Sequence, residues 1–434
     1  MRAASPSLHI LWDDSHIWGV IAAKAARAMR LPHRLILGRD IARGLFERER
    51  PAMLLVPGGN ARHKAQSLGS EGMEAIRAYV RTGGRYLGFC GGAGLALNAE
   101  TAELGLGLCP WKRGRFDERL QHFMSGHLHV ALPDGAAADG RLVPGDFPAS
   151  PRLPVWWPGR FAPSARDGLT ILASYERPAA DFWLADLAIA DLPPDTFAAW
   201  HDLYGVSMNP AFLAGQPCLV HGRFGEGEYV LSYSHLETPG SPEANRWLAH
   251  LFRSLAGFEP AVEHIPAWRM RKGTDPENGA GHTADRRWDD PLLERMEHGL
   301  ETIRQTGLKH GLLFERTDWL MGWRSGIPGA SLNNLWSALR VIRESEPNEA
   351  AGNRLAELGP RLAESVSLFA EGCTQYFLAE RLSQTVSRFM PDAVSPGLLN
   401  DQRTALFGPP MQAGGLYKAV MDPLDELALL QLQK

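Results

Sequence analysis

The sequence predicts an α/β domain built on a parallel sheet, followed by a second, all-α domain. Before residue 90, short apolar runs alternate with amphipathic stretches of helical period. Such alternation is typical of βαβ units, in which helices cover both faces of a parallel sheet. The composition turns polar between residues 271 and 287, and the apolar residues beyond that segment recur with helical spacing. We therefore place the α/β domain at 1–265, a linker at 266–287 and the helical domain at 288–434.

Each element of the α/β domain is expected from its apolar pattern. Strands are short continuous apolar runs, whereas helices repeat apolar residues every three or four positions. Asp13, Asp14 and Ser15 carry side chains suited to capping the first helix, whose apolar face runs from Ile17 to Met29. The strands are predicted at residues 8–12, 34–37, 52–56 and 85–89, and the helices at 17–29, 41–46 and 71–80.

The later elements follow a less regular pattern. Between residues 132 and 217 the chain is rich in Pro, Gly and Ala, and we expect antiparallel strands joined by long loops. Strands at 217–221 and 228–234 flank a glycine-containing hairpin connection, and a helix at 243–255 closes the domain. In the second domain, apolar residues at helical spacing predict helices over 292–303, 332–342 and 355–369, and no strand is expected.

Composition argues against several classes of function. The 434-residue chain has a net charge of −4, so it lacks the positive charge with which proteins bind nucleic acid or anionic membranes. Its first residues lack the apolar core of a secretory signal, and no apolar run approaches the roughly 20 residues that cross a bilayer. Four widely spaced cysteines without a Cys-x-x-Cys pair indicate reduced thiols. We expect a cytoplasmic protein without a cofactor.

The clearest chemical signal is Cys90, which lies in Gly88-Phe89-Cys90-Gly91-Gly92 between a predicted strand and a helix-like stretch. In a nucleophile elbow a strand turns sharply into a helix, and flanking glycines avoid the clash that side chains would cause there. The sulfur then stands exposed on the turn and faces the positive end of the helix, which favours the thiolate. The pattern predicts a cysteine nucleophile.

A cysteine nucleophile needs a base and a group that orients the base. His235 and Glu237 follow the last predicted strand, and residues two apart at a strand end project to the same side. The oxyanion that forms on attack at a carbonyl needs backbone amide donors. Gly91 supplies one donor, and Gly58 or Gly59, in the loop after the third strand, supplies the second. For His235 alone, a histidine satisfied by a backbone carbonyl is the alternative.

The order of these motifs resembles the class I glutamine amidotransferase-like superfamily: a Pro-Gly-Gly loop, a Gly-x-Cys-x-Gly elbow, a Gly-x-Gly hairpin and His-x-Glu. More narrowly, three segments are similar to the amino-terminal domain of fungal biotin-protein ligases and its stand-alone bacterial relatives. They are Leu55-Val56-Pro57-Gly58-Gly59, Tyr86-Leu87-Gly88-Phe89-Cys90-Gly91-Gly92 and Phe224-Gly225-Glu226-Gly227. The resemblance implies a flavodoxin-like sheet. It also implies Cys90 as the nucleophile, His235 as the base and Glu237 as the orienting acid.

Two departures from these families bear on function. Glutamine-hydrolysing members usually carry a glutamine two residues beyond the second elbow glycine, where this chain has Gly94. The basic glycine-rich loop and the Lys-Trp-Pro-Asn-Asp-like run of the biotin ligase catalytic segment have no counterpart in the sequence. We therefore expect neither glutaminase activity nor biotin transfer from this chain.

Four residues are expected to contact the substrate. Asn60 follows the glycine loop and Gly92 ends the elbow. Trp157 and Gly159 belong to an aromatic, glycine-containing segment that the family resemblance places over the cleft as a lid. Plain core packing of these aromatic side chains is the alternative.

Other motifs carry weaker chemical signals. His127 and His129 lie two apart on a predicted strand, but no carboxylate or cysteine at close spacing supports a metal site, and we expect none. Cys109, Cys218 and Cys373 have no base in their sequence neighbourhood and are expected to be buried thiols. In the helical domain, core packing is the expected use of the amphipathic faces, and self-association or a protein partner is the alternative.

The sequence therefore predicts a cysteine hydrolase or acyl transferase that acts on a small amide or acyl substrate. The substrate carbonyl would form a thioester with Cys90, and His235 would assist its hydrolysis or its transfer to an amine. A catalytically silent module that binds such a ligand and signals through the helical domain is the alternative.

Overall fold

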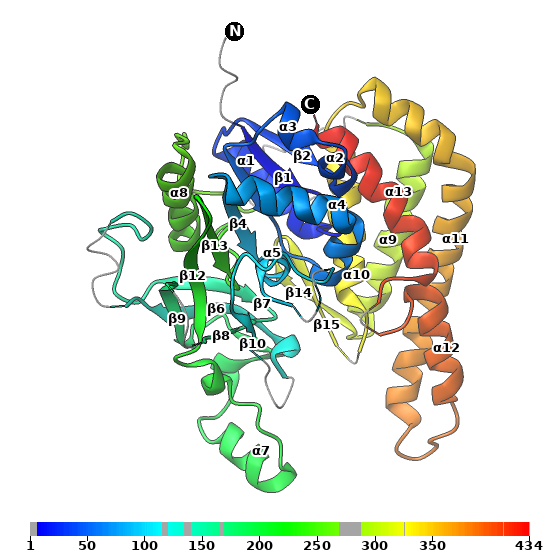
Figure 1. Ribbon diagram of the computed structural model, residues 1–434. Helices are drawn as coiled ribbons and strands as arrows, with labels where there is room; N and C mark the ends of the chain where they lie inside the picture. The colour runs from blue at the N-terminus through cyan, green and yellow to red at the C-terminus, as the bar shows by residue number, and fades with distance from the viewer. Residues whose placement is uncertain are drawn as a thin grey trace, which may run out of the picture. The chain divides into compact units, whose positions relative to one another are not determined.

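The computed structural model (Figure 1) describes residues 7–433 with the exception of 100, 102, 115–119, 134–139, 165–167, 269–287, 325 and 411. The chain divides into two compact units, residues 1–266 and 267–434. Most of the linker predicted at 266–287 lies outside the described residues. Among the described residues, no helix combines the length and the apolar character that crossing a membrane requires.

Five parallel strands form the centre of the first unit. In spatial order they are β2, β1, β3, β4 and β13, which is the doubly wound order of flavodoxin-like folds with β13 as the fifth strand. The predicted α/β fold is therefore confirmed. Ligands bind at the carboxyl ends of such strands, so a ligand-binding site is expected at the loops after β1, β3, β4 and β13. The bounds are β1 (Leu8–Leu11), β2 (His33–Ile36), β3 (Met53–Val56), β4 (Arg85–Phe89) and β13 (Gly227–Ser232).

Both faces of these strands are covered. Leu54 and Val56 of β3 belong to a hydrophobic cluster that includes side chains of the long helix α4 (Ala61–Arg81). Leu55 between them points to the opposite face and is also buried. Burial on both faces explains why these strands read as continuous apolar runs rather than as alternating ones.

Two glycines break helical stretches in this unit. The helix predicted at 41–46 is instead two short helices, because Gly44 between them has a φ of 79°, which an α-helix does not allow. The helix predicted at 71–80 is the second half of α4, which kinks at Gly69, where φ is 60°. The helices of this unit are α1 (Ile17–Ala28), α2 (Gly38–Ala42), α3 (Leu45–Arg48), α4, α5 (Gly91–Ala96), α7 (Thr196–Tyr204) and α8 (Pro242–Ala256).

Antiparallel strands extend the sheet beyond β13. The predicted hairpin pairs β12 with β13, and its connection is the two-residue turn Gly225-Glu226, where Gly225 has a φ of 63°. From β13 outward the order is β12, β9, β6, β10 and β11, with β7 paired to β6. The strands are β6 (Met124–Ala131), β7 (Arg152–Trp156), β9 (Thr170–Pro178), β10 (Trp183–Leu184), β11 (Leu187–Ala188) and β12 (Pro217–Phe224), and β5 (Lys112–Arg113) pairs separately with β8 (Phe161–Ala162).

The second unit is helical, as predicted, but it also contains a hairpin. β14 (Leu313–Thr317) and β15 (Leu320–Trp323) pair antiparallel, although no strand was expected there. The pair is too short for a period-two pattern to stand out, and Asn333 satisfies it from outside by donating to and accepting from the backbone of Met321. The helices are α9 (Pro291–Lys309), α10 (Gly329–Arg343), α11 (Glu349–Val386), α12 (Pro396–Phe407) and α13 (Gly415–Leu432).

Candidate functional site

Cys90 lies on a strained turn between β4 and α5. Its φ of 47° and ψ of −103° are unusual for a residue other than glycine. The turn is held from both sides, because the Cys90 amide donates to the Ser232 carbonyl (2.7 Å) and the Cys90 carbonyl accepts from the Gly94 amide (2.8 Å). A strained backbone conformation that surrounding hydrogen bonds hold in place is typical of functional sites. The strand, turn and helix predicted around Cys90 are all present.

The glycines of this turn allow backbones to approach each other. A Cβ on Gly91 would lie 2.0 Å from the carbonyl oxygen of Gly59, and one on Gly92 would lie 2.0 Å from that of Val56. Neither contact is possible for a real side chain, so only glycine fits at either position. Gly92, predicted to contact the substrate, is thus buried against β3.

The loop after β3 lies against the Cys90 turn. A Cβ on Gly58 would lie 2.8 Å from the His235 imidazole, and Gly59 has a φ of 114°. A Cβ added to Gly91 would lie 3.2 Å from the Gly59 nitrogen. The two predicted oxyanion donors are therefore neighbours. Asn60, predicted to contact the substrate, caps α4: its Oδ1 accepts from the two amides that follow it by two and three residues.

His235 and Glu237 form a buried pair beside this loop. The His235 Nδ1 donates to Glu237 Oε1 at 2.7 Å, and both side chains are almost completely buried. Their proximity was expected, but the reason given for it was wrong. β13 ends at Ser232, and the two residues lie in a turn in which the Thr238 amide donates to the His235 carbonyl (3.1 Å). A turn, not strand alternation, brings them together.

Two residues that the sequence analysis missed hold this pair in place. The indole of Trp18 packs against the His235 imidazole with 4.1 Å between ring centroids. Asn245 of α8 donates to the carbonyls of Leu236 (3.0 Å) and Thr238 (2.8 Å) and so fixes the turn. Trp18 lies at the start of α1, which follows β1, and β1 is the neighbour of β3 in the sheet. The predicted sheet order could therefore have suggested that Trp18 lies near the site. Nothing in the local sequence marks Asn245.

The ionisation of Cys90 and His235 is coupled. Burial opposes ionisation of the Cys90 thiol, but its interactions with His235 and the charge of Arg113 prevail, so the thiol pKa is lowered. Burial likewise opposes protonation of His235, yet the negative charges of Glu237 and Cys90 raise the imidazole pKa. Both shifts favour a thiolate beside an imidazolium. Arg113, on β5, was not predicted as a residue of the site.

His235 Nε2, the nitrogen available to Cys90, has no aligned hydrogen-bond partner among the described residues. The Cys90 thiol is nevertheless close enough to shift the pKa of the ring and to be shifted by it. The thiol and the imidazole therefore lie close together without a well-formed hydrogen bond between them. Catalytic hydrogen bonds are often long or bent before substrate binds, so this geometry is compatible with proton transfer.

The segment predicted as a lid packs near the pair through a different tryptophan. Trp156 lies 6.4 Å from Trp18 between ring centroids, and its indole N–H donates to Thr238 Oγ1 at 3.4 Å. Trp157 is half-buried at a φ of 62°. Gly159 lies against a ring: a Cβ there would be 2.5 Å from the side chain of Tyr233, which follows β13. Gly159 is therefore a close-packing position.

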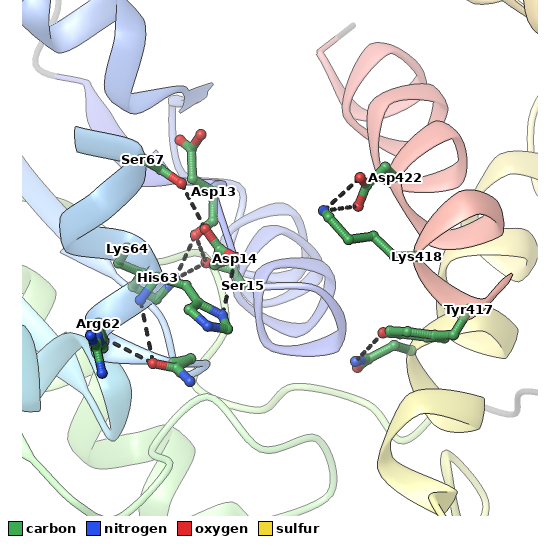
Figure 2. Close-up of polar contacts among 12 residues, drawn as sticks. Asp13, Asp14, Ser15, Arg62, His63, Lys64, Ser67, Tyr417, Lys418 and Asp422 are labelled. Carbon is green, nitrogen blue, oxygen red and sulfur yellow. Dashed lines mark hydrogen bonds and ion pairs between the residues drawn. The ribbon is translucent and has the colours of Figure 1, made fainter. Parts of the chain in front are cut away.

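Lys64 holds the loop after β1 (Figure 2), and the glycine loop after β3 packs against that loop. Its buried ammonium donates to the Asp13 carbonyl (2.8 Å) and to Ser15 Oγ (2.5 Å). This holds the loop after β1, whose Asp14 carbonyl oxygen lies where a Gly59 Cβ would be. The capping role predicted for residues 13–15 was wrong, because α1 begins after His16 and the Asp13 carboxylate accepts from the Gly38 amide instead.

The remaining cysteines and the predicted histidine pair do not add to this site. Cys109, Cys218 and Cys373 are buried, as expected, and burial raises the thiol pKa of Cys218 and Cys373. His127 and His129 do not converge: His129 Nδ1 contacts the Ser150 carbonyl, and His127 contacts Asp181. The described residues contain no group of three or more His, Cys, Asp or Glu side chains arranged to hold a metal.

Comparison with known protein families gives a match over the segment that contains the Cys90 turn. Residues 47–104 match the family described as biotin-protein ligase, N terminal, which confirms the predicted resemblance over the loop after β3 and the Cys90 turn. His235 and Glu237 lie outside the matched residues. A sequence search of curated proteins finds no match.

Solved structures align with about three fifths of the chain. A protein described as thuA-like from Bacteroides uniformis is 11% identical and covers 59% of this chain and 93% of its own, with a TM-score of 0.37. A protein from Thermoplasma acidophilum described as a GMP synthase subunit is 12% identical, and the alignment covers 59% of this chain and 94% of that protein, with a TM-score of 0.36. A glutamine amidotransferase from Thermotoga maritima is 12% identical, and the alignment covers 58% of this chain and 84% of that protein, with a TM-score of 0.33.

Proposed function

We propose that the chain is a cysteine-dependent hydrolase or acyl transferase that acts on a small amide or acyl substrate at Cys90. One observation carries the proposal: the thiol lies on a strained turn beside an imidazole that a buried carboxylate orients. The directions of the two pKa shifts support it, because both favour the nucleophilic thiolate. The family match over residues 47–104 supports the nucleophile segment.

The proposed reaction has two steps. The Cys90 thiolate attacks the acyl carbon, and the oxyanion accepts hydrogen bonds from the amides of Gly59 and Gly91. Protonated His235 gives its proton to the departing amine, which leaves a thioester on Cys90. Water or an acceptor amine then attacks the thioester, His235 takes its proton, and the thiolate departs. Glu237 holds the imidazole in one tautomer and stabilises its charge throughout.

Gly59 is the better of the two candidates for the second oxyanion donor. Its nitrogen lies next to Gly91, and its amide donates no hydrogen bond among the described residues. The amide of Gly91 is at the first position of α5, where helical amides have no partner within the helix. Gly58 instead lies against the rings of Trp18 and His235 and so fixes the imidazole. Two free amides side by side suit a developing oxyanion.

Selective alkylation tests the nucleophile. Iodoacetamide should label Cys90 at least ten times faster than Cys109 or Cys218, since both of these are buried and burial raises the thiol pKa of Cys218. His235→Ala should remove most of this advantage, whereas Cys109→Ser, the control, should leave Cys90 labelling unchanged. Peptide mass spectrometry after timed labelling gives the rates. If Cys90 reacts no faster than the buried thiols, it is not the nucleophile.

Turnover separates an enzyme from a silent binding module. A panel of small amides and thioesters is incubated with the wild type and with Cys90→Ser, and both product formation and thermal stabilisation are followed. An enzyme should give product with the wild type alone. Equal stabilisation of both proteins without product would instead support a module that binds its ligand without cleaving it.

A further inference from the structure

A second set of hydrogen-bonded side chains lies in the first unit outside the Cys90 site. His127 of β6 donates through Nδ1 to Asp181 Oδ2 at 2.6 Å, and its Nε2 lies 2.9 Å from Ser241 Oγ. The His127 backbone amide also donates to the other Asp181 oxygen at 3.3 Å. The proposed reaction at Cys90 uses none of these residues.

The order of contacts assigns a role to each atom. Because the Asp181 carboxylate accepts the Nδ1 proton, the neutral ring presents the Nε2 lone pair, and the Ser241 hydroxyl donates to it. Burial opposes ionisation of Asp181, but His127 prevails and lowers the carboxyl pKa, so the carboxylate is charged at neutral pH. A hydroxyl, an imidazole and a carboxylate connected in this order activate serine for attack on acyl carbon.

These three residues line a cavity of about 300 Å³. Ser241, only 3% exposed, is among the residues that line this space, whereas the side chains of Asp181 and Arg152, which also line it, are each 56% exposed. A small acyl group therefore has room beside the hydroxyl. The lining residues are His127, Arg152, Ala180, Asp181, Gly240, Ser241, Pro242 and Glu243.

The position of Ser241 on the helix is a second, independent observation. Ser241 precedes α8, where a serine hydroxyl usually accepts hydrogen bonds from the first helical amides. Here it makes no such bond and contacts His127 instead. Pro242 has no amide hydrogen, and the amides of Glu243 and Ala244 have no acceptor within the helix. These two amides can donate to an oxyanion at Ser241.

We propose that Ser241, His127 and Asp181 form a second acyl-transfer site, which takes small carboxylic esters. His127 Nε2 takes the hydroxyl proton as Ser241 Oγ attacks the ester carbon, and then gives that proton to the departing alkoxide. The acyl group remains on Ser241 until water attacks it, with His127 again taking the proton. Release of the carboxylic acid returns the proton to Ser241, so the reaction needs only the ester and water.

A purely structural role is the competing interpretation. The same hydrogen bonds connect β6, the 179–182 turn and the start of α8, and they would stabilise the fold without any reaction. The two interpretations differ in the reactivity of the Ser241 oxygen. A structural hydroxyl reacts no faster with an organophosphorus electrophile than other serines do, whereas an activated one reacts selectively.

Labelling of the full chain with a fluorophosphonate tests the proposal. Mass spectrometry should find the phosphonyl group on Ser241 in the wild type and equally in Cys90→Ala, because the two sites share no reacting group. Ser241→Ala should abolish the labelling. Asp181→Asn and His127→Gln should slow it at least tenfold, whereas Ser254→Ala, on the same helix with its hydroxyl donating to the His250 carbonyl, should leave it unchanged.

The controls keep this result separate from the reaction at Cys90. Each variant is checked by circular dichroism and by its rate of Cys90 alkylation, which Ser241→Ala should not alter. Ester hydrolysis, followed with p-nitrophenyl acetate in the Cys90→Ala background, should fall at least tenfold on adding Ser241→Ala. A folded wild type whose Ser241 stays unlabelled, or labelling that is as fast in folded Asp181→Asn or His127→Gln, would overturn the proposal.

Discussion

At the scale of single residues, the charge on Cys90 depends on what surrounds its sulfur. Burial by itself would raise the thiol pKa, as it does for Cys218. At Cys90 the imidazole of His235 and the guanidinium of Arg113 reverse the direction. The buried Glu237 carboxylate keeps the imidazole charged, because it accepts the Nδ1 proton in a place that water does not reach. The reactivity of one sulfur therefore rests on several side chains from distant parts of the chain.

The pH dependence of Cys90 alkylation should follow from this arrangement. Iodoacetamide reacts with the thiolate, so the rate rises through the thiol pKa and is level above it. Because that pKa is lowered, the half-maximal rate should fall below 9.0, the ordinary value for a thiol. In His235→Ala, burial remains while the opposing interaction is lost, and the midpoint should move to higher pH. Timed labelling across a series of pH values measures both curves, and identical midpoints would contradict this account.

At the scale of secondary-structure elements, the site depends on how closely β3, β4 and their loops approach each other. Gly91 and Gly92 bring the start of α5 against the backbone of β3 and of the loop after it. Gly94, two positions farther along, has more space around it, because a Cβ there would lie 3.4 Å from the Ala61 Cβ and would meet no other atom within 4 Å. Neighbouring glycines of the same helix thus have different structural roles.

Alanine substitutions should separate these roles. Gly92→Ala should destabilise the first unit by about 2–3 kcal/mol or more and slow Cys90 alkylation, because the new Cβ would overlap the Val56 carbonyl. Gly94→Ala should be neutral or stabilising by up to about 1 kcal/mol, because alanine favours the helix and fits. Thermal unfolding and alkylation rates measure both effects. Equal destabilisation by the two substitutions would show that the close approach at Gly92 is not the cause.

Glu228 connects β13 to its neighbours and should make stability depend on pH. Its buried carboxylate contacts Arg85 (2.9 Å), Arg141 (2.5 Å) and His221 (3.0 Å). Burial opposes its ionisation, but the hydrogen bonds from His221 and Arg141 lower its pKa from 4.5 to about 2. A lowered carboxyl pKa contributes stability that is complete above 4.5 and is lost as the pH falls towards 2.

Glu228→Gln should therefore destabilise the first unit by about 1–3 kcal/mol at pH 7. The difference from the wild type should shrink as the pH falls from 4.5 towards 2, because the wild-type carboxyl is then protonated too. Urea unfolding at a series of pH values measures it. Glu226→Gln, at the exposed turn of the same hairpin, is the control and should have little effect at any pH. A difference that stays constant down to pH 2 would rule out the carboxylate charge as its source.

At the scale of the whole molecule, the chain forms two compact units that divide at residue 266. Every group assigned to the Cys90 site, and every member of the second site, lies in the first unit. A hydrophobic cluster that runs from Leu11 to Tyr233 is contained in that unit as well. Self-association or partner binding through the helical unit stays a prediction.

A fragment that ends at residue 268 should fold and keep the reactivity of the site. Its hydrophobic cluster is complete, so removing residues 269–434 should leave the Cys90 alkylation rate within about twofold of that of the full chain. The fragment's circular dichroism and labelling rate provide the measurement. A folded fragment with an unreactive Cys90 would show that the helical unit contributes to the site.

Local sequence patterns predicted the parallel strands and the residue types of the Cys90 site. Apolar runs located the parallel strands, and the glycines around Cys90 indicated a turn that only glycine can flank, because both signals depend on neighbours along the chain. The same local reasoning failed at residues 13–15, whose side chains bind β1, Gly38 and Lys64 rather than cap α1. It also failed for the β14–β15 hairpin, which Asn333 stabilises from another element.

Which side chains meet depends on contacts between elements that are distant in the chain. Trp18, Arg113 and Asn245 act on the Cys90 site from separate elements, and no local pattern distinguishes them from other residues of their type. The same holds for Ser241 and Asp181, which reach His127 across the fold. Periodicity records which face of an element is buried, whereas hydrogen bonds and pKa values depend on the atoms that folding brings within a few ångströms.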